Sequence, residues 1–407
     1  MRIAFLSHYF PPEVGAPSAR VSELAAAWAR HHTVTVLTGF PNHPTGLIPA
    51  EYRGRWFAEE RRDGYRVLRS WLYATPNEGV ARRTLNHVSF MVSGFLTGAV
   101  KLERPDVIVA TSPTFFCVFA AWALGVRFRA PFVFEVRDLW PEIFVQLGVL
   151  KNRQLIRLLE AAELWLYRRA ARVVTVTRGF AENIAARGIA AEKIVVIPNG
   201  ADLERFRPGP RSETVRAALG AGDADFLVLY IGAHGISHAL ERVLEVAEKL
   251  RARPGIRFAL VGDGARKAVL VRLAEEKGLA NVMFLPSQPR ESVPDFYRSA
   301  DLCLVPLRNV PLFSTFIPSK MFEIMGCGRP ILGAVRGEAA EILRESGGAV
   351  VVNPEDTEAM SRSIERLAAD PAARAEMGRQ GRLYVGQHFD RAVLADRYRV
   401  CLEELVR

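Results

Sequence analysis

The chain has 407 residues, of which 49% are hydrophobic and 24% are charged, and this composition is typical of a globular protein with a packed core. The length allows two domains, and no apolar run reaches the roughly 18 residues expected of a membrane-spanning helix. The four cysteines lie far apart, so we expect reduced thiols in a cytosolic protein and no cysteine metal site. The first residues lack the long apolar core of a signal peptide.

The net charge of +10 is unevenly distributed along the chain. Residues 1–205 hold 26 Lys and Arg against 18 Asp and Glu, whereas the remainder holds 28 against 26. Nucleic acid, an anionic membrane surface or a phosphorylated acceptor could each explain a basic first half. No nucleic-acid-binding motif is present, so we expect no nucleic-acid partner.

The first elements predict a strand–helix–strand unit. An apolar run at 2–7 enters the loop H-Y-F-P-P-E-V-G-A-P-S-A-R, and apolar residues then recur at helical spacing before a second strand at 33–37. Gly15 in the loop would let the backbone approach a ligand, although a plain turn is the alternative. The loop T-G-F-P-N-H-P-T-G follows the second strand, and His43 in it could contact a ligand or simply serve turn formation.

Three segments of the first half could face a membrane surface. Residues 51–64 are polar but contain Trp56, which indicates either an interfacial surface or a solvated loop with a packed tryptophan. An apolar helix that starts with two arginines is predicted at 82–102, and a basic amphipathic helix is predicted at 153–172. Ordinary core packing is the alternative for both helices.

Charged residues follow the predicted strand at 132–136 in the string E-V-R-D-L-W-P-E. Ligands of doubly wound sheets bind at the carboxyl ends of strands, so Arg137, Asp138 and Glu142 are candidate site residues. The alternative is a cluster of surface ion pairs. Further strands are predicted at 172–176 and 193–197, and the polar string P-N-G-A-D-L-E-R-F-R-P that follows is the expected domain linker.

The second half repeats the α/β pattern. Strands are predicted at 226–231, 256–261, 282–285, 301–306, 331–334 and 349–352, with helices between them and a final helix at 391–406. The loop G-A-H-G-I-S-H follows the first of these strands. Two successive α/β halves with a cleft between them are therefore the expected architecture.

The string P-S-K-M-F-E-I-M-G-C-G-R-P, at 318–330, predicts a short helix with Ser319 as its N-terminal cap. Lys320 and Glu323 share one face of this helix, three residues apart. A lysine beside free backbone N–H groups can bind an anion, and the carboxylate can accept hydrogen bonds from hydroxyls. A site that binds phosphate beside a diol would suit a nucleotide sugar. The alternative is that the two residues form a solvated Lys–Glu pair on the surface.

Taken in order, these strings resemble the GT-B glycosyltransferases of family 4. The resemblance is strongest to bacterial enzymes that add a sugar, often an N-acetylated deoxyhexosamine, during O-antigen, capsule or colanic-acid assembly. It spans nearly the whole chain and implies two Rossmann-like domains facing across a central cleft. The implied boundaries are 1–203 for an acceptor-binding domain, 204–390 for a nucleotide-sugar-binding domain, and a helix at 391–407 that rejoins the first domain.

The resemblance also implies roles for individual residues. Glu323 would hold the ribose hydroxyls, Lys320 and Ser319 the diphosphate, and Asp138 would lie near the reacting groups, so that Asp138, Lys320 and Glu323 are the implied catalytic residues. The other donor-binding residues are Gly15, His234, Gly235 and Arg290. The implied acceptor-side residues are Glu13, His43, Arg137 and Glu142.

Two positions depart from the wider family. A second glutamate is expected eight residues before Glu323, where this chain has Thr315. An Arg and a Lys are expected after the first strand of the second half, where this chain has His234 and His238. Lys320 would therefore supply most of the positive charge toward phosphate.

The expected function is retaining transfer of a sugar from a nucleotide donor, UDP above all, to a lipid-linked saccharide acceptor. No metal or other cofactor is expected, because fixed cations can stabilise the leaving diphosphate and no D-x-D carboxylate pair is present. The expected location is cytoplasmic, at the inner face of the cell membrane. The alternatives are a non-hydrolysing UDP-N-acetylhexosamine epimerase and a non-catalytic subunit that binds nucleotide sugar or membrane.

Overall fold

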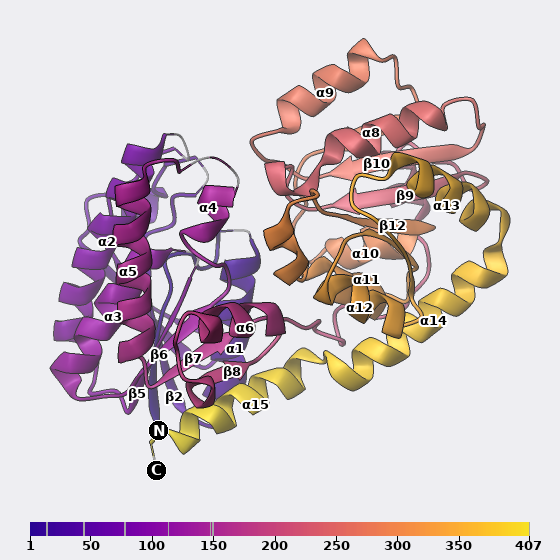
Figure 1. Cartoon of the computed structure of the whole chain (residues 1–407). Coiled ribbons are helices and arrows are strands. Elements are labelled where there is room, and N and C mark those ends of the chain that lie inside the picture. The colour runs from indigo at the N-terminus through magenta and orange to yellow at the C-terminus, as the bar shows by residue number, and fades with distance from the viewer. Residues whose placement is uncertain are drawn as a thin grey trace. The chain divides into compact units, whose positions relative to one another are not determined.

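The computed structural model describes residues 1–13, 15–43, 45–76, 79–112, 114–146, 148 and 150–406. The chain divides into two compact units (Figure 1). The first unit comprises Met1–Pro198 together with Ala392–Arg407, and the second comprises Asn199–Arg391. The division falls slightly before residue 203, where the sequence places the boundary.

The first unit contains an eight-stranded sheet in the order β3-β4-β2-β1-β5-β6-β7-β8. Every pair of neighbours is parallel except β3 and β4, which are antiparallel. The strands are β1 (Arg2–Leu6), β2 (Thr33–Gly39), β3 (Phe57–Arg62), β4 (Tyr65–Ser70), β5 (Val107–Thr111), β6 (Phe132–Val136), β7 (Arg172–Thr175) and β8 (Ile194–Val196). In the register, Phe5 of β1 lies between Val36 of β2 and Val109 of β5.

Helices cover both faces of this sheet. They are α1 (Ala16–Ala29), α2 (Val80–Lys101), α3 (Phe115–Phe128), α4 (Glu142–Gln146), α5 (Arg153–Arg169), α6 (Arg178–Ala186) and α15 (Arg391–Glu404). Apolar residues of α1 and α15 share one core with alternate residues of the strands, for example Trp28 and Tyr398, whose rings are 5.1 Å apart. Helices α2, α3 and α5 lie side by side on the other face (Figure 1).

The second unit contains a six-stranded, wholly parallel sheet in the order β11-β10-β9-β12-β13-β14. Its strands are β9 (Phe226–Ile231), β10 (Ile256–Val261), β11 (Val282–Leu285), β12 (Leu302–Pro306), β13 (Ile331–Ala334) and β14 (Ala349–Val352). The run F-L-V-L-Y-I of β9 is buried at every residue, as expected for a parallel strand covered on both faces.

The helices of the second unit complete its two outer layers. They are α7 (Glu213–Ala218), α8 (Leu240–Lys249), α9 (Lys267–Glu276), α10 (Val293–Ser299), α11 (Lys320–Gly326), α12 (Glu338–Glu345), α13 (Thr357–Ala369) and α14 (Pro371–His388). Helices α8, α9 and α13 share one apolar core with the sheet. Single-turn 3-10 segments occur at Ala50–Tyr52, Ala191–Lys193, Ile236–His238 and Pro311–Thr315.

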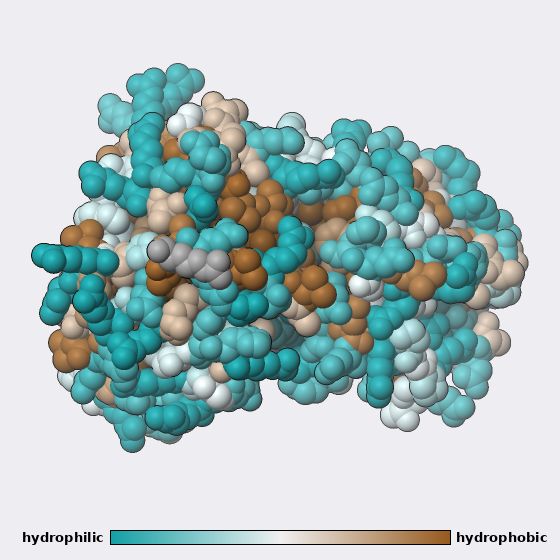
Figure 2. Space-filling model, turned by 90° about the horizontal axis from the view of Figure 1, so that it is seen from below, coloured by the Kyte–Doolittle hydropathy of each residue, from teal (hydrophilic) through white to brown (hydrophobic). Residues whose placement is uncertain are grey.

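Most of the surface drawn in Figure 2 is hydrophilic, and hydrophobic residues form smaller areas within it. All four cysteines are buried and unpaired, as the sequence predicts. Trp56 is 74% exposed, so the predicted alternative of a packed Trp56 is wrong. Residues 51–64, which contain Trp56, are also not a loop throughout, because Phe57–Arg62 forms the edge strand β3.

Candidate functional site

In the second sheet the strand order reverses between β9 and β12, which is the topological switch point of the sheet. From β9 the chain adds β10 and β11 on one side, and it then returns to the other side of β9 with β12, β13 and β14. Parallel sheets bind ligands at the carboxyl ends of the strands where this reversal occurs. The loop after β9 carries Gly232, His234 and Gly235, and the segment after β12 leads into α11 and Lys320.

The ammonium group of Lys320 is buried at this reversal. Its Nζ atom lies 3.8 Å from the centroid of the Tyr230 ring and has no hydrogen-bond partner within the described part of the chain. Burial lowers the pKa of Lys320 from 10.5 to about 7, and the nearby Glu323 carboxylate opposes this shift. The predicted alternative of a solvated Lys–Glu pair on the surface is therefore wrong.

Glycines bring the loops after β9 and β10 into direct contact. A Cβ atom added to Gly232 would lie 2.5 Å from Lys320 Nζ, and one added to Gly262 would lie 1.9 Å from the Gly232 carbonyl oxygen. Both residues have positive φ angles, of 147° and 142°, that side chains disfavour. The sequence therefore needs glycine at both positions to let the two backbones meet beside the lysine.

Two histidines lie beside Lys320. His234 is fully buried, and neither of its ring nitrogens has a hydrogen-bond partner among the described residues. Burial lowers the pKa of His234 to about 4, and burial together with Lys320 lowers the pKa of His238 to about 3. Both imidazoles are therefore neutral at pH 7. Leaving polar groups such as Lys320 Nζ and His234 unpaired costs about 1–3 kcal/mol each, which a polar ligand could recover.

Glu323, on the same helix as Lys320, is 9% exposed and pairs with Arg290. The distance between Arg290 Nη2 and Glu323 Oε1 is 3.3 Å, and the guanidinium also lies 5.7 Å from the centroid of the Phe206 ring. The structure thus joins two residues that the sequence predicts separately, 33 positions apart.

Two hydroxyl groups lie near Lys320 in the chain, those of Ser319 and Thr315. The first does not make the predicted capping bond, and the second bonds to a backbone carbonyl. Ser319 has helical backbone angles, φ −57° and ψ −27°, and its side chain makes no capping hydrogen bond, so the predicted cap is wrong. A capping residue needs an extended backbone for its hydroxyl to reach the next turn. The Thr315 hydroxyl donates to the Leu312 carbonyl at 2.7 Å.

In the first sheet the strand order reverses between β1 and β5. Glu13, in the loop after β1, accepts hydrogen bonds from the backbone N–H groups of Phe10 at 3.3 Å and of Asn42 and His43 at 2.9 Å each. Its carboxylate therefore ties the loop after β1 to the loop after β2. Gly15 begins α1 with an extended backbone, φ 160°.

The segment after β6 places Asp138 in a partly buried position. Burial raises the pKa of Asp138 from 3.8 to about 6, and Arg137 opposes this shift. The backbone N–H of Arg137 donates to Ser112 Oγ, at the end of β5, at 2.9 Å. Glu142, at the start of α4, accepts a hydrogen bond from Asn183 at 3.3 Å.

The structure also brings together residues at this edge that the sequence analysis missed. Arg20 of α1 pairs with the fully buried Glu135 of β6 at 2.8 Å. The rings of His8, after β1, and His87, on α2, lie 4.8 Å apart. These pairs are 115 and 79 positions apart, so no local spacing signals them.

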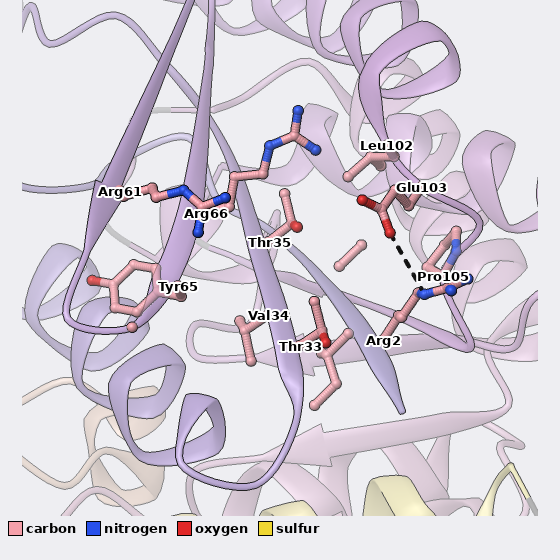
Figure 3. Close-up of a pocket in the computed structure, with 13 residues that line it drawn as sticks. Arg2, Thr33, Val34, Thr35, Arg61, Tyr65, Arg66, Leu102, Glu103 and Pro105 are labelled. Atoms are coloured by element: carbon pink, nitrogen blue, oxygen red, sulfur yellow. Dashed lines mark ion pairs between the residues drawn. The ribbon is translucent and has the colours of Figure 1, made fainter.

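A pocket of about 130 Å³ lies at the opposite, amino-terminal edge of the first sheet (Figure 3). It is lined by the starts of β1 and β2 and by the β3–β4 hairpin, and Arg2 and Glu103 in its wall approach to 3.6 Å. None of the predicted site residues lines it. We do not assign a function to this pocket, because parallel sheets bind ligands at the other edge.

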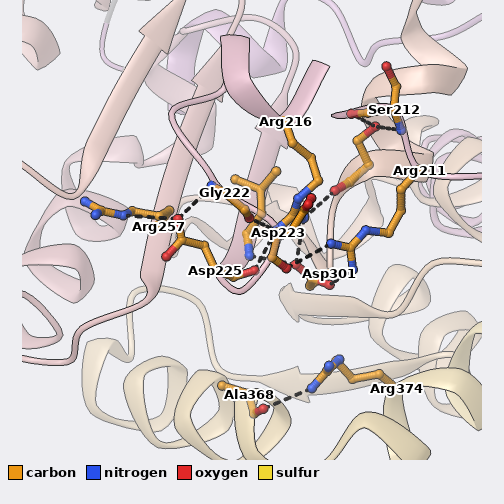
Figure 4. Close-up of polar contacts among 12 residues, drawn as sticks. Arg211, Ser212, Arg216, Gly222, Asp223, Asp225, Arg257, Asp301, Ala368 and Arg374 are labelled. Carbon is orange, nitrogen blue, oxygen red and sulfur yellow. Dashed lines mark hydrogen bonds and ion pairs between the residues drawn. The ribbon is translucent and has the colours of Figure 1, made fainter. Parts of the chain in front are cut away.

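An ion-pair network fixes the amino-terminal edge of the second sheet (Figure 4). Arg216 of α7 is 1% exposed and donates to Asp301 at 3.0 Å, immediately before β12. The same guanidinium donates to the carbonyl groups of Gly222, Asp225 and Ser299. Since its charge is paired with Asp301 and both of its terminal nitrogens donate within the protein, this network stabilises the fold at the far end of the strand that leads to Lys320.

Within the described ranges, no three His, Cys, Asp or Glu side chains are arranged to hold a metal ion. Metal independence remains a prediction. None of the helices in the described part of the chain combines the length and the apolar content needed to cross a bilayer.

Comparison with known proteins identifies related domains in both units. The family model of the glycosyl transferase 4-like domain matches residues 15–200, and that of glycosyl transferases group 1 matches residues 211–384. The chain is 28% identical to the putative colanic acid biosynthesis glycosyl transferase WcaI of Escherichia coli K12, over 91% of this chain and 93% of that protein.

Solved structures show the same two-domain fold. Sucrose-phosphate synthase from Thermosynechococcus elongatus superposes with a TM-score of 0.78 at 21% identity, covering 99% of this chain and 98% of that one. HepE of Anabaena, in complex with UDP and glucose, superposes with a TM-score of 0.74 at 18% identity, covering 99% of each chain.

Proposed function

We propose a function for this chain that follows from its family. The chain belongs to the GT-B glycosyltransferases, with a glycosyl transferase 4-like domain followed by a glycosyl transferases group 1 domain. In the proposal it transfers a sugar from a UDP-sugar donor to a lipid-linked saccharide during surface polysaccharide assembly. The observation that carries the donor assignment is the burial of Lys320 Nζ and the His234 ring at the point where the strand order of the second sheet reverses, both without a hydrogen-bond partner among the residues that the structure describes. The name of WcaI and the UDP complex of HepE support the choice of pathway and donor.

In this proposal Lys320 neutralises the diphosphate and His234 donates a hydrogen bond to it. Glu323, oriented by Arg290, accepts hydrogen bonds from the ribose hydroxyls. As the bond between the sugar and the diphosphate breaks, negative charge grows on the leaving phosphate, and a fixed ammonium group stabilises it there. The acceptor oxygen bonds to the anomeric carbon on the face from which the diphosphate leaves, the hydroxyl proton passes to the departing phosphate oxygen, and UDP is released, so the configuration is retained.

On the acceptor side we assign Asp138, Arg137, Glu142 and His43. Asp138 combines a raised pKa of about 6 with a place at the carboxyl end of β6, which suits a carboxylate that orients an acceptor hydroxyl. Glu13 acts indirectly, because its oxygens hold the backbones of Asn42 and His43. Gly15, directly before α1, stays a proposed donor-binding residue.

A screen of nucleotide sugars tests the proposal. The chain is mixed in turn with UDP-glucose, UDP-N-acetylglucosamine, GDP-mannose and ADP-glucose, and binding is followed by thermal shift. Stabilisation by a UDP-sugar supports the proposal, and indifference to all four contradicts it. Chromatography of the same mixtures tests the epimerase alternative, since an epimerase converts its UDP-sugar without any acceptor.

We further propose that α2 and α5 rest on an anionic membrane surface. Four exposed apolar residues of α2 follow one stripe, Leu85, Val92, Leu96 and Val100, and two more lie on α5, Leu155 and Leu158. Arginines lie at the start of α2, at 82 and 83, and at the end of α5, at 168 and 169. Apolar residues between cations suit the interface of an anionic bilayer. The enzyme would then work at the inner face of the membrane that carries its acceptor.

A further inference from the structure

The linker that enters the second unit packs against helix α11, which carries Lys320 and Glu323. This linker comprises residues 199–212 and ends where α7 begins. Its Phe206 is 0% exposed. A Cβ atom added to Gly326, the last residue of α11, would lie 2.8 Å from the Phe206 carbonyl oxygen and 3.1 Å from the Phe206 Cβ atom. The absence of a side chain at Gly326 therefore lets the linker approach the donor-site helix this closely.

Two arginines hold the linker backbone at Phe206. Arg298 of α10 donates to the Arg205 carbonyl at 3.3 Å and to the Arg207 carbonyl at 2.9 Å. Arg382 of α14 donates to the carbonyl of Phe206 itself at 3.4 Å. Hydrogen bonds from charged donors are stronger than those between neutral groups, and here they fix three successive carbonyl groups. The Phe206 ring is therefore held in a defined place and not carried on a mobile connection.

The Phe206 ring meets the candidate donor site at Arg290. The Arg290 guanidinium lies 5.7 Å from the ring centroid and donates to Glu323 at 3.3 Å. Arg290 belongs to the segment between β11 and α10, of which residues 286, 287, 289 and 291 are exposed. A guanidinium stacks on the face of an aromatic ring. The exposed segment thus supplies the arginine, and the buried ring gives it a fixed surface beside Glu323.

We propose that Phe206 is a positioning residue of the donor site, which acts through Arg290 on Glu323 and so sets the affinity for the ribose of the donor. This inference rests on the proposed function, because it concerns the ribose contact assigned there to Glu323. A carboxylate that accepts hydrogen bonds from two hydroxyls binds them best when its own partner is held in place. The diphosphate contact at Lys320 does not involve the ring and should not depend on it.

Two ligands that differ only in the ribose diol test this role. Calorimetry compares UDP with 2′,3′-dideoxy-UDP, which keeps the base and the diphosphate. We expect Phe206→Leu to weaken UDP about fivefold and dideoxy-UDP less than about twofold, since only the diol needs the oriented carboxylate. Equal weakening of both ligands would assign Phe206 to the support of the whole site, and unchanged affinities would give it no role. Either result overturns the inference.

The wild type separates this inference from the proposed function. If the wild type binds neither ligand, the proposed donor site fails and the inference fails with it. If the wild type binds both ligands equally, the donor site stands but the ribose contact of Glu323 fails, and the role of Phe206 is overturned. A preference for UDP in the wild type that Phe206→Leu keeps in full overturns the inference alone.

Phe226 provides a matched control. Arg374, drawn in Figure 4, lies 5.0 Å from the centroid of its ring, and Phe226 is 8% exposed. Phe226 begins β9, at the amino-terminal edge of the same sheet, away from the candidate donor site. Phe226→Leu removes the same kind of contact, and we expect it to change the ratio of the two affinities less than about twofold. A change as large as in Phe206→Leu would show a general loss of rigidity and would overturn the assignment.

A double-mutant cycle tests whether Phe206 acts through Glu323. In the Glu323→Gln background the oriented carboxylate is gone, so Phe206→Leu should weaken UDP less than about twofold there. The same fivefold loss in both backgrounds would show that Phe206 acts independently of the carboxylate, which contradicts the proposal.

Hydrogen exchange of the wild-type chain gives a reading that needs no substitution at the buried ring. Saturating UDP should slow the exchange of the linker amides at 203–207 more than saturating dideoxy-UDP does. The reason is that the ribose restrains Glu323 and, through Arg290, the ring of Phe206. Equal exchange with the two ligands would overturn the inference.

Discussion

At the scale of single residues, Lys320 is unusual because it combines burial, contact with an aromatic ring and the absence of a hydrogen bond within the described chain. With a pKa lowered to about 7, the free protein holds this lysine partly neutral at physiological pH. Bound phosphate would favour the ammonium form, so donor binding should draw a proton onto Lys320.

The affinity for UDP is therefore expected to fall as the pH rises above about 7. Between pH 7.5 and 8.5 the protonated fraction of Lys320 falls nearly tenfold, and the dissociation constant should rise by about the same factor. UDP itself is fully ionised in this range, since its last phosphate pKa is about 6. Calorimetry at the two pH values measures the change. Lys320→Arg, whose charge is permanent, should abolish it, and a constant affinity in the wild type would contradict the account.

Glu323 offers a test of the ribose contact. Glu323→Gln is expected to weaken UDP binding by about 1.5–3 kcal/mol, because a hydrogen bond to a charged group is lost. Inorganic pyrophosphate has no ribose, so its affinity for the same site should change little. Competition against a fluorescent UDP analogue measures both. An equal loss for UDP and pyrophosphate would remove Glu323 from ribose binding.

At the scale of elements, helix α14 supports the helix that carries Lys320 and Glu323. Helices α11 and α14 pack together through small residues, and a Cβ atom at Gly381 of α14 would lie 3.1 Å from Met325 Cγ. At Gly378 a Cβ atom would lie 2.2 Å from the Gly328 carbonyl oxygen, whereas at Gly386 of the same helix it would meet nothing within 4 Å.

This contrast predicts opposite effects of one substitution in one helix. Gly378→Ala is expected to destabilise the protein by about 1–3 kcal/mol, because the added methyl group meets backbone that cannot move aside. Gly386→Ala is expected to stabilise it by up to about 1 kcal/mol, through helix propensity alone. Thermal denaturation of both variants under identical conditions gives the two shifts. A similar shift in both would mean that α14 does not pack closely on the Gly328 turn.

The element scale also shows what the sequence could predict. Apolar runs such as 226–231 predict the buried parallel strands, because both faces are covered. The hairpin of β3 and β4 escaped prediction because F-A-E-E-R-R is an edge strand whose polar residues face solvent. Within the candidate site, Lys320 and Glu323 follow from local helical spacing. The Arg290–Glu323 pair and the contact of His8 with His87 depend on tertiary folding, which no local pattern encodes.

At the scale of the whole molecule, the account predicts binding to anionic vesicles. Each basic residue near such a surface contributes about 1 kcal/mol, and salt screens the attraction over about 10 Å at 0.1 M. The protein should co-sediment with phosphatidylglycerol vesicles at low salt, dissociate at high salt and ignore phosphatidylcholine vesicles. Glutamine at Arg82, Arg83, Arg168 and Arg169 should weaken binding.

A second pair of variants tests the apolar contribution of α2. Leu96→Gln, on its exposed stripe, should weaken vesicle binding, whereas Leu383→Gln, on α14 of the other unit, should not. The two leucines are 58% and 50% exposed, so the comparison holds exposure nearly constant. If both variants bind like the wild type, the apolar stripe plays no part in binding.

Metal independence is a property of the complete reaction. The proposed site offers cations toward the diphosphate, so release of UDP from a UDP-sugar in the presence of cell-membrane lipids should continue in EDTA. Release that stops in EDTA and resumes on addition of Mg²⁺ or Mn²⁺ would contradict the prediction.

The central claim is that the buried ammonium group of Lys320 binds the diphosphate of the sugar donor. Calorimetric titration of UDP at pH 7 into the wild type, Lys320→Met and the surface control Lys249→Met tests it most directly. Lys249 pairs with Glu358 on the surface of the same unit, so its loss removes an equal charge away from the site. We predict that Lys320→Met weakens UDP binding at least tenfold and that Lys249→Met leaves it unchanged. Wild-type affinity in Lys320→Met would contradict the account.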